Sequence, residues 1–112
     1  MSLLDVSVTE AESGPVVVLA GEADVNTLAQ LNSVLNDQIW AGARLVTVDL
    51  SGLRFADSAT IAALVSAART LRDQGGDLEL LSPQSAVDRV LSLTGVDQAL
   101  IVRRTLQPDH DC

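Results

Sequence analysis

The pattern of apolar and polar positions predicts two strands at the start of the chain. Apolar and polar residues alternate over residues 4–9, which is typical of a half-buried strand, and residues 16–20 form a short apolar run. Residues 11–15 between them include Gly14 and Pro15 and read as a turn. We therefore expect the two strands to form a hairpin.

Helical spacing follows in three segments. Residues 27–41, 59–72 and 83–94 each repeat apolar positions every three to four residues, as an amphipathic helix does. Ser82 and Pro83 have the composition of a helix start, with a capping hydroxyl followed by proline at the first helical position. Trp40 ends the first of these helices. We expect it to cover the edge of the core, and a role in binding is the alternative. Two apolar runs, 45–50 and 78–81, read as strands between the helices.

The resulting order of elements is β-β-α-β-α-β-α, then a short turn or helix at 96–100 and an apolar segment at 101–102. Alternation predicts parallel strands joined by right-handed crossovers, and the opening hairpin adds an antiparallel edge. The predicted fold is α/β, a single domain with a small mixed sheet of about four to five strands packed with about four helices. Residues 1–106 are expected to form this domain and residues 107–112 a disordered C-terminal tail.

Composition narrows the class of function. The net charge of −8 argues against nucleic-acid binding and against direct membrane contact, because both surfaces are anionic. The chain has no lysine, which excludes a P-loop and a Schiff base. Its one histidine, His110, and one cysteine, Cys112, lie in the predicted tail, so we expect no catalytic triad, internal disulfide or metal site. Without a signal-peptide pattern or an apolar run long enough to span a membrane, we expect a cytoplasmic protein.

The candidate functional stretch is the turn between residues 45–50 and the helix at 59–72. It places Asp57 and Ser58 at a helix N-terminus, where free N–H groups and a partial positive charge favour an anion, including a phosphate carried by serine. The outer face of that helix is small and nearly uncharged, and consists of Ala59, Ala62, Ala63, Ser66 and Thr70. We expect this face to dock a protein partner, with Ser58 as a regulatory rather than a catalytic hydroxyl.

Taken together, these motifs resemble those of STAS domains, and most closely the anti-sigma factor antagonists of bacteria. The segments 49–51 (Asp-Leu-Ser) and 55–58 (Phe-Ala-Asp-Ser) resemble the family signature. The segment 21–24 (Gly-Glu-Ala-Asp) matches the family turn after the second strand. Gly75-Gly76, Ser82-Pro83 and the segment 93–96 (Leu-Thr-Gly-Val) also fit, so the resemblance extends over residues 5–105.

The resemblance implies a non-enzymatic switch that needs no cofactor. In this family the unmodified antagonist binds an anti-sigma factor that is also a serine kinase, is released when the kinase phosphorylates the serine after the aspartate, and is restored by a serine phosphatase. Carried over to this sequence, Ser58 is the phosphorylation site. The residues that this predicts to bind the partner are Asp24, Asp57, Ser58, Ala59, Thr60, Ala62, Ala63 and Ser66.

The sequence departs from the family pattern at Thr60, where the family usually has glycine. A β-branched threonine hinders close approach of a kinase backbone, and its hydroxyl is a second candidate acceptor. Two alternatives remain open. One is a STAS scaffold subunit of a stress-signalling or lipid-transport complex that phosphorylation does not regulate. The other is an enzyme that uses Ser58 or a convergent cluster of Asp24, Asp49 and Asp57, although a phospho-aspartate receiver would need a lysine that the chain lacks.

Overall fold

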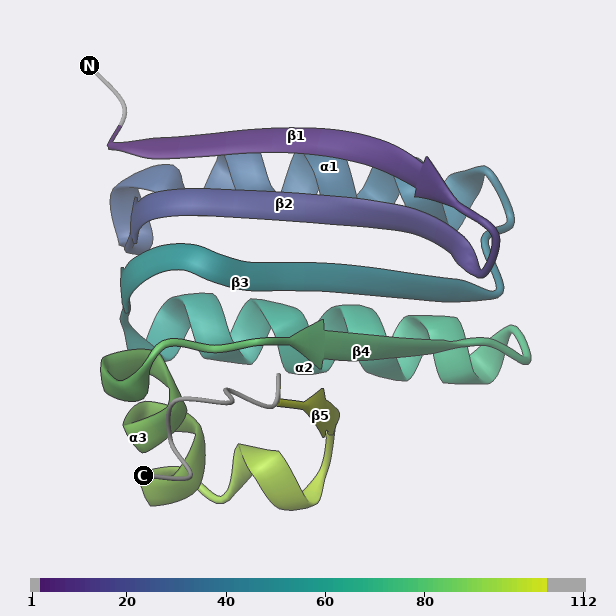
Figure 1. The fold of residues 1–112 in the computed structure, drawn as a ribbon. Helices are drawn as coiled ribbons and strands as arrows, with labels where there is room; N and C mark the ends of the chain where they lie inside the picture. Colours follow the sequence, from purple (N-terminus) through teal and green to yellow (C-terminus); the bar gives the residue numbers. More distant parts are fainter. Residues whose placement is uncertain (1–2, 105–112) are drawn as a thin grey trace.

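In the computed structural model, the described part of the chain, residues 3–104, forms a five-stranded sheet with helices packed on it (Figure 1). The strands are β1 (Leu4–Ala11), β2 (Gly14–Ala23), β3 (Leu45–Ala56), β4 (Asp77–Leu81) and β5 (Ile101–Arg103). The helices in this range are α1 (Leu28–Trp40), α2 (Ser58–Asp73) and α3 (Ser85–Leu93), with short 3₁₀ helices η1 (Val25–Thr27) and η2 (Val96–Gln98). The predicted α/β class is confirmed. The expected four helices become three α-helices, because residues 96–98 form only a 3₁₀ turn.

The sheet has the order β1-β2-β3-β4-β5, which is also the order of the chain. β1 pairs with β2 in antiparallel orientation, and the later neighbours pair in parallel. This confirms the predicted hairpin and the predicted parallel pairing, and it adds residues 101–103 as a fifth strand beside β4. Because β2 and β3 are parallel neighbours, the turns that follow them lie together at one end of the molecule (Figure 1).

The core is aliphatic. α1 and α2 cover one face of the sheet (Figure 1), and α3 packs against β3. Burying each large aliphatic side chain contributes roughly 1.5–3 kcal/mol, so these contacts hold the helices on the sheet. The buried side chains include Leu19, Leu31, Leu35, Val48, Leu50, Leu64, Leu71 and Leu80.

Trp40 does not take the position that the sequence predicts for it. Its side chain is 88 % exposed, whereas its neighbour Ile39 is buried against the core. Successive residues of an α-helix point about 100° apart, so only one of the two can face the sheet at the end of α1. The prediction that Trp40 covers the edge of the core is therefore wrong.

Both strands that lead to the candidate turns are longer than predicted. The sequence places their ends at residues 20 and 50, but pairing continues to Ala23 and Ala56. Gly21 and Gly52, which lie just past these predicted ends, are at irregularities in the β2–β3 register. A Cβ on Gly21 would lie 2.1 Å from the carbonyl oxygen of Leu3, so this glycine permits a close backbone approach. Because β2 and β3 continue to Ala23 and Ala56, the two candidate turns lie beyond the ends of these longer strands.

The start of α3 also differs from the prediction. Ser82 has a φ of 55°, and its N–H donates to the carbonyl oxygen of Arg103 (2.8 Å), so it connects β4 to β5 and does not cap a helix. α3 begins at Ser85 with Gln84 as its N-cap residue. The Gln84 side chain donates from Nε2 to the carbonyl oxygen of Ser51 (2.7 Å) and so ties the start of α3 to β3.

Some expectations concern residues outside the described range. The predicted tail, residues 107–112 with His110 and Cys112, lies outside it, as does the predicted domain end at residue 106. Within residues 3–104, no helix is both long and apolar enough to cross a membrane. In the same range, no group of three or more His, Cys, Asp or Glu side chains is placed to hold a metal ion.

Candidate functional site

Asp57 joins the two turns that the sequence singles out. Its Oδ1 accepts hydrogen bonds from the N–H and from the hydroxyl of Thr60, both at 2.9 Å, and so caps α2. Its Oδ2 accepts from the N–H of Val25 in η1 at 3.0 Å. The Asp57 N–H in turn donates to the carbonyl oxygen of Ala23 at the end of β2 (3.2 Å). One side chain thus fastens the start of α2 to the start of η1.

These hydrogen bonds also fix the charge of Asp57. Partial burial raises the pKa of its carboxyl group, but the bonds from the Thr60 N–H, the Thr60 hydroxyl and the Val25 N–H outweigh that effect. The net result is a pKa below the ordinary aspartate value. Asp57 is therefore an anion at neutral pH, and it lies beside Ser58.

Asp24 lies at the same end of the sheet and caps the other turn. Its Oδ1 accepts from the N–H of Asn26 (2.9 Å), and its own N–H donates to the hydroxyl of Thr27 (3.0 Å). These contacts form a capping box for η1. The structure thus brings together the turns that carry Asp24 and Asp57 and gives both carboxylates a local structural role.

Asp49 lies far from this pair. It pairs with Val18 on β2 and with Leu81 on β4, and its Oδ1 accepts from the N–H of Ser51 (2.9 Å). Seven residues of β3 lie between it and Asp57, and these eight steps along the chain correspond to roughly 25 Å at the usual rise of a strand. The alternative of a convergent acidic cluster of Asp24, Asp49 and Asp57 is therefore wrong, because β3 continues well past Asp49.

Ser58 is the first residue of α2, and its side chain is exposed. Its hydroxyl makes no hydrogen bond to another described residue, in contrast to the hydroxyl of Thr60 two positions later. The Asp57 carboxylate accepts a hydrogen bond from the Thr60 N–H. The Asp57 carbonyl oxygen accepts one from the Ile61 N–H (3.1 Å). The N–H groups of Ser58 and Ala59 are therefore the donors at this helix N-terminus that can bind an anion.

Thr60 lies on the inner side of the helix. It is 1 % exposed, so its side chain is not available to a docking partner or to a kinase, and the expectation of a second acceptor here is wrong. Ala59 and Ala63 are half-buried, while Ala62 and Ser66 are exposed. The small-residue face of α2 is thus narrower than the sequence predicts.

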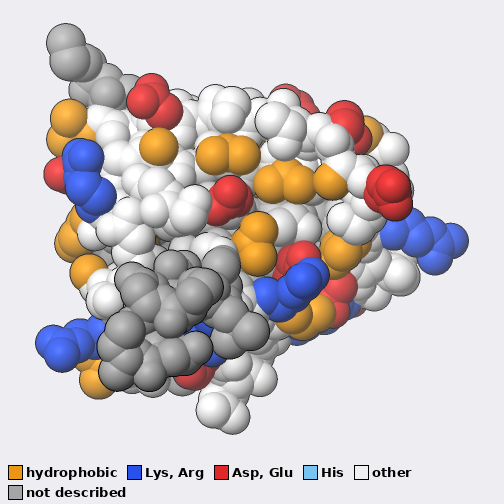
Figure 2. Space-filling view, in the orientation of Figure 1, with side chains coloured by type: hydrophobic (Ala, Val, Ile, Leu, Met, Phe, Trp, Pro, Cys, Tyr) orange, Lys and Arg blue, Asp and Glu red, His pale blue; other side chains and the backbone are white. Residues whose placement is uncertain are grey.

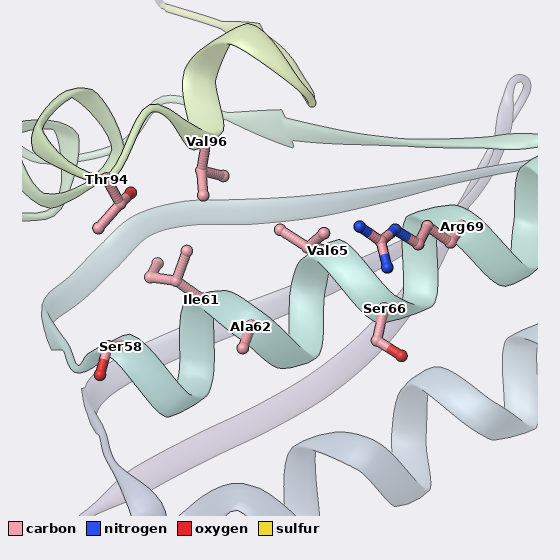
Figure 3. Close-up of a pocket in the computed structure, with 8 residues that line it drawn as sticks. All are labelled: Ser58, Ile61, Ala62, Val65, Ser66, Arg69, Thr94 and Val96. Atoms are coloured by element: carbon pink, nitrogen blue, oxygen red, sulfur yellow. The ribbon is translucent and has the colours of Figure 1, made fainter.

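A groove runs beside this face, between α2 and the loop that joins α3 to η2 (Figure 3). Its volume is about 380 Å³. Thr94 and Val96 reach toward α2 from the opposite wall, Ser58 lies at one end, and Arg69 lies towards the other. The remaining lining residues are Ile61, Ala62, Val65 and Ser66. An apolar groove with a hydroxyl at one end and a cation at the other is suited to binding a segment of a partner.

Sequence reasoning missed several members of this surface. Val65 is half-buried, and Arg69 carries no pattern that would mark it. Val96 belongs to the 93–96 motif, but that motif did not place it on the wall of a groove. A signal was present in Gly95, which takes a φ of 76° and so turns the chain back toward α2 at Val96. That turn brings the opposite wall of the groove into place.

Exposed apolar side chains lie near Ser58. Val25 donates its N–H to Asp57 and is 64 % exposed. Phe55, the next-to-last residue of β3, is 49 % exposed. Leu93, next in the chain to Thr94 of the groove, is 79 % exposed. Exposed apolar groups gathered around a groove are typical of protein interaction sites.

The sheet face opposite α1 and α2 has a different character. On the part of this face that Figure 2 colours by residue type, apolar side chains lie between acidic, basic and other polar ones. Val16, Val18 and Ala20 are half-buried there, and Ile101 is 41 % exposed. The surface around Ser58 is therefore the better candidate for docking, because it combines a groove with exposed apolar groups.

Comparison with known proteins agrees with this fold. The "Anti-sigma-B factor antagonist" of Staphylococcus aureus (strain NCTC 8325 / PS 47) is 25 % identical over 99 residues, which cover 88 % of this chain and 92 % of that protein. A solved anti-sigma factor antagonist from Mycobacterium paratuberculosis superimposes with a TM-score of 0.84 at 23 % identity, over 92 % of this chain and 87 % of the other. SpoIIAA of Bacillus, in its unphosphorylated form, superimposes with a TM-score of 0.76 at 20 % identity, over 96 % and 92 %.

The two structural likenesses show a shared fold, and a family model extends the match to the sequence. The model described as "Mlab, STAS domain" matches residues 6–104. That range contains both candidate turns, the whole of α2 and both walls of the groove. The chain belongs to the STAS domain family.

Proposed function

We propose that this chain is an anti-sigma factor antagonist, a non-enzymatic cytoplasmic protein that binds an anti-sigma factor serine kinase and is released when Ser58 is phosphorylated. A serine phosphatase then returns it to the binding form. The observation that carries the proposal is the exposed Ser58 at the N-terminus of α2, directly after Asp57 and at the end of the groove. The curated relative from Staphylococcus aureus, named as an antagonist of this kind, supports it.

The proposed docking surface follows from the geometry of the site. Ser58, Ala62 and Ser66 present their exposed side chains along α2, and Val25 and Phe55 add exposed apolar area near Ser58. Asp24 and Asp57 hold the two turns in place, and their carboxylates make this end of the surface acidic. The partner segment that fits has an apolar ridge, with basic groups that meet the acidic end.

Phosphorylation of Ser58 would reverse this complementarity. A phosphate adds about −1.5 to −2 charges at neutral pH. The free N–H groups of α2 accommodate that charge within the domain, so no large conformational change is needed. A docked partner, in contrast, would meet a buried charge beside Asp57. A loss of only about 3 kcal/mol lowers affinity more than a hundredfold.

The experiment that tests the proposal is an intact-mass measurement after incubation with ATP and an anti-sigma factor kinase from the same organism. The wild-type chain is expected to gain one phosphate and Ser58→Ala none. Ser66→Ala is the matched control, because it removes another exposed serine hydroxyl from the same helix, and it is expected to gain one phosphate like the wild type. Phosphate on Ser58→Ala, or its loss from Ser66→Ala, would contradict the assignment of Ser58.

A second candidate function is a STAS subunit of another assembly, which binds its partner without phosphorylation. Two observations favour it. The matching family model is described after a different STAS protein, Mlab. Thr60, where antagonists usually have glycine, is buried and bonded to Asp57. Stable binding of a partner with no transfer of phosphate, when the kinase is active on another substrate, would favour this candidate over the first.

A further inference from the structure

A second exposed feature lies at the opposite end of the molecule from Ser58. Trp40 is the only tryptophan of the chain, ends α1 and is 88 % exposed. Tryptophan supplies more binding energy on burial than most residues and is enriched among the dominant contacts of interfaces. A side chain of this kind, held on a helix and left in solvent, points to a partner that covers it.

The surface beside Trp40 is hollow. A groove of about 410 Å³ lies between the C-terminal ends of α1 and α2 and is lined by Asn36, Ile39, Trp40, Gly42, Thr70 and Gln74. A Cβ added to Gly42 would meet nothing within 4 Å, so this wall of the groove is open. The groove is large enough to accept an indole ring, and its rim already carries one.

Charges of both signs lie close along the chain to the residues that line this groove. Asp37 precedes Trp40 by one helical turn, Asp73 precedes the groove residue Gln74, and Arg44 follows Trp40 by four residues. All three charged side chains are exposed. None of the ion pairs found among residues 3–104 involves them. One patch therefore carries a projecting ring, a receiving groove, a free cation and free anions.

From this combination we propose that the Trp40 surface binds a second copy of the same chain. A two-fold contact requires a patch that is complementary to itself. Here Trp40 of each copy enters the groove of the other, and Arg44 of each faces the acidic residues of the other. Ser58 lies at the far end of α2, so it stays uncovered in the pair. The inference is independent of the function proposed for Ser58.

The area available indicates a weak, reversible dimer. Each indole buries roughly 200 Å² and covers a similar area on the other copy, so two copies bury about 800 Å² before the charged rim is counted. Stable interfaces bury about 1,200–2,000 Å², and weak, transient ones fall below that range. The net charge of −8 on each copy opposes association, although salt near 0.15 M screens charges beyond about 8 Å. We therefore expect a dimer that forms with rising protein concentration.

The test is sedimentation together with tryptophan emission over a wide range of protein concentration at physiological salt. The wild-type mass is expected to rise from 11.7 kDa toward twice that value. Because Trp40 is the only tryptophan and the chain has no tyrosine, its emission reports directly on this surface and is expected to shift to the blue as the dimer forms. A wild type that stays at the monomer mass throughout would overturn the proposal.

Variants connect the association to this surface. Trp40→Ala is expected to stay monomeric, and Arg44→Glu to shift association to concentrations at least tenfold higher. Phe55→Ala is the matched control, an exposed aromatic residue at the end of β3, and is expected to associate like the wild type. Association of Trp40→Ala at wild-type strength, or association of the wild type without an emission shift, would show that another surface is used and would refute the inference.

Discussion

Removing the Asp57 carboxylate tests whether this residue fastens the two turns together. Asp57→Ala loses the cap of α2, which costs about 1 kcal/mol. It also loses the hydrogen bond from the Val25 N–H to Oδ2, a net contribution of about 1 kcal/mol more. The expected decrease in the free energy of unfolding is therefore about 2 kcal/mol, which corresponds to a melting temperature lower by about 8 °C for a domain of this size.

The measurement is urea unfolding followed by circular dichroism, with the free energy extrapolated to water. Asp37→Ala is the control, an exposed helical acid whose carboxylate bonds to no described residue, and it is expected to change stability by less than about 0.5 kcal/mol. A loss for Asp57→Ala no larger than that of the control would refute the reasoning, because the three hydrogen bonds to its carboxylate would then contribute nothing.

The same carboxylate sets a dependence on pH. The pKa of Asp57 is lower in the folded chain than in the unfolded one, so the unfolded state binds more protons and stability rises with pH in this range. The contribution is fully present above the unfolded value of about 3.9 and is lost as the pH falls through the lower folded value. The stability difference between wild type and Asp57→Ala should therefore be constant near neutral pH and shrink in acid. A difference that grows in acid would contradict this sign.

Two further predictions concern neighbouring residues. Thr60→Val removes the hydroxyl that donates to Asp57, so the free energy of unfolding should fall by about 1 kcal/mol. The pKa of Asp57, followed by NMR titration, should rise toward its ordinary value. An unchanged pKa would argue against this hydrogen bond. Leu64→Ala leaves a cavity at a fully buried position and should lower the free energy of unfolding in urea by about 2–5 kcal/mol. The Leu93 side chain is 79 % exposed, so Leu93→Ala should change that free energy by less than about 0.5 kcal/mol. Leu93→Ala should nevertheless weaken partner binding measured by calorimetry. Equal losses of stability for the two leucines would contradict the description of the core.

The fold was accessible from the sequence because its signals are local and agree with one another. Alternation over residues 4–9, helical periodicity in 27–41 and 59–72, and glycine at 75 and 76 each mark one element. Parallel pairing then follows from the order of those elements. The same logic predicts that Asp24 and Asp49, after neighbouring strands, converge near Asp57. The Val25 N–H bonded to Asp57 confirms this for the Asp24 turn, whereas the continuation of β3 to Ala56 contradicts it for Asp49.

The misplaced elements share a physical cause. The predicted strands end at residues 20 and 50, but pairing between β2 and β3 continues past both ends, with irregularities in register at Gly21 and Gly52. Ser82 is a residue type that commonly caps helices, but next to the β4–β5 pair its N–H donates to the carbonyl oxygen of Arg103. In each case a long-range hydrogen bond decides a position that local propensity assigns otherwise.

The candidate site was accessible only in part for a similar reason. Ser58 and Ala62 follow from motif and periodicity, and both are exposed. The burial of Thr60 depends on its bond to Asp57 and on the packing of α2, and the wall formed by Val96 depends on how the chain returns after α3. Such features depend on three-dimensional packing, which a linear pattern does not contain.

The central claim is that Ser58 controls docking to an anti-sigma factor, and its most direct test is a calorimetric titration. The unphosphorylated chain and the chain phosphorylated on Ser58 are titrated separately with the same anti-sigma factor kinase, with Ala62→Glu as a variant that places a charge in the groove without touching the serine. We predict measurable affinity for the unphosphorylated chain and affinity at least a hundredfold weaker for both the phosphorylated chain and Ala62→Glu. Equal affinity of the phosphorylated and unphosphorylated chains would contradict the account.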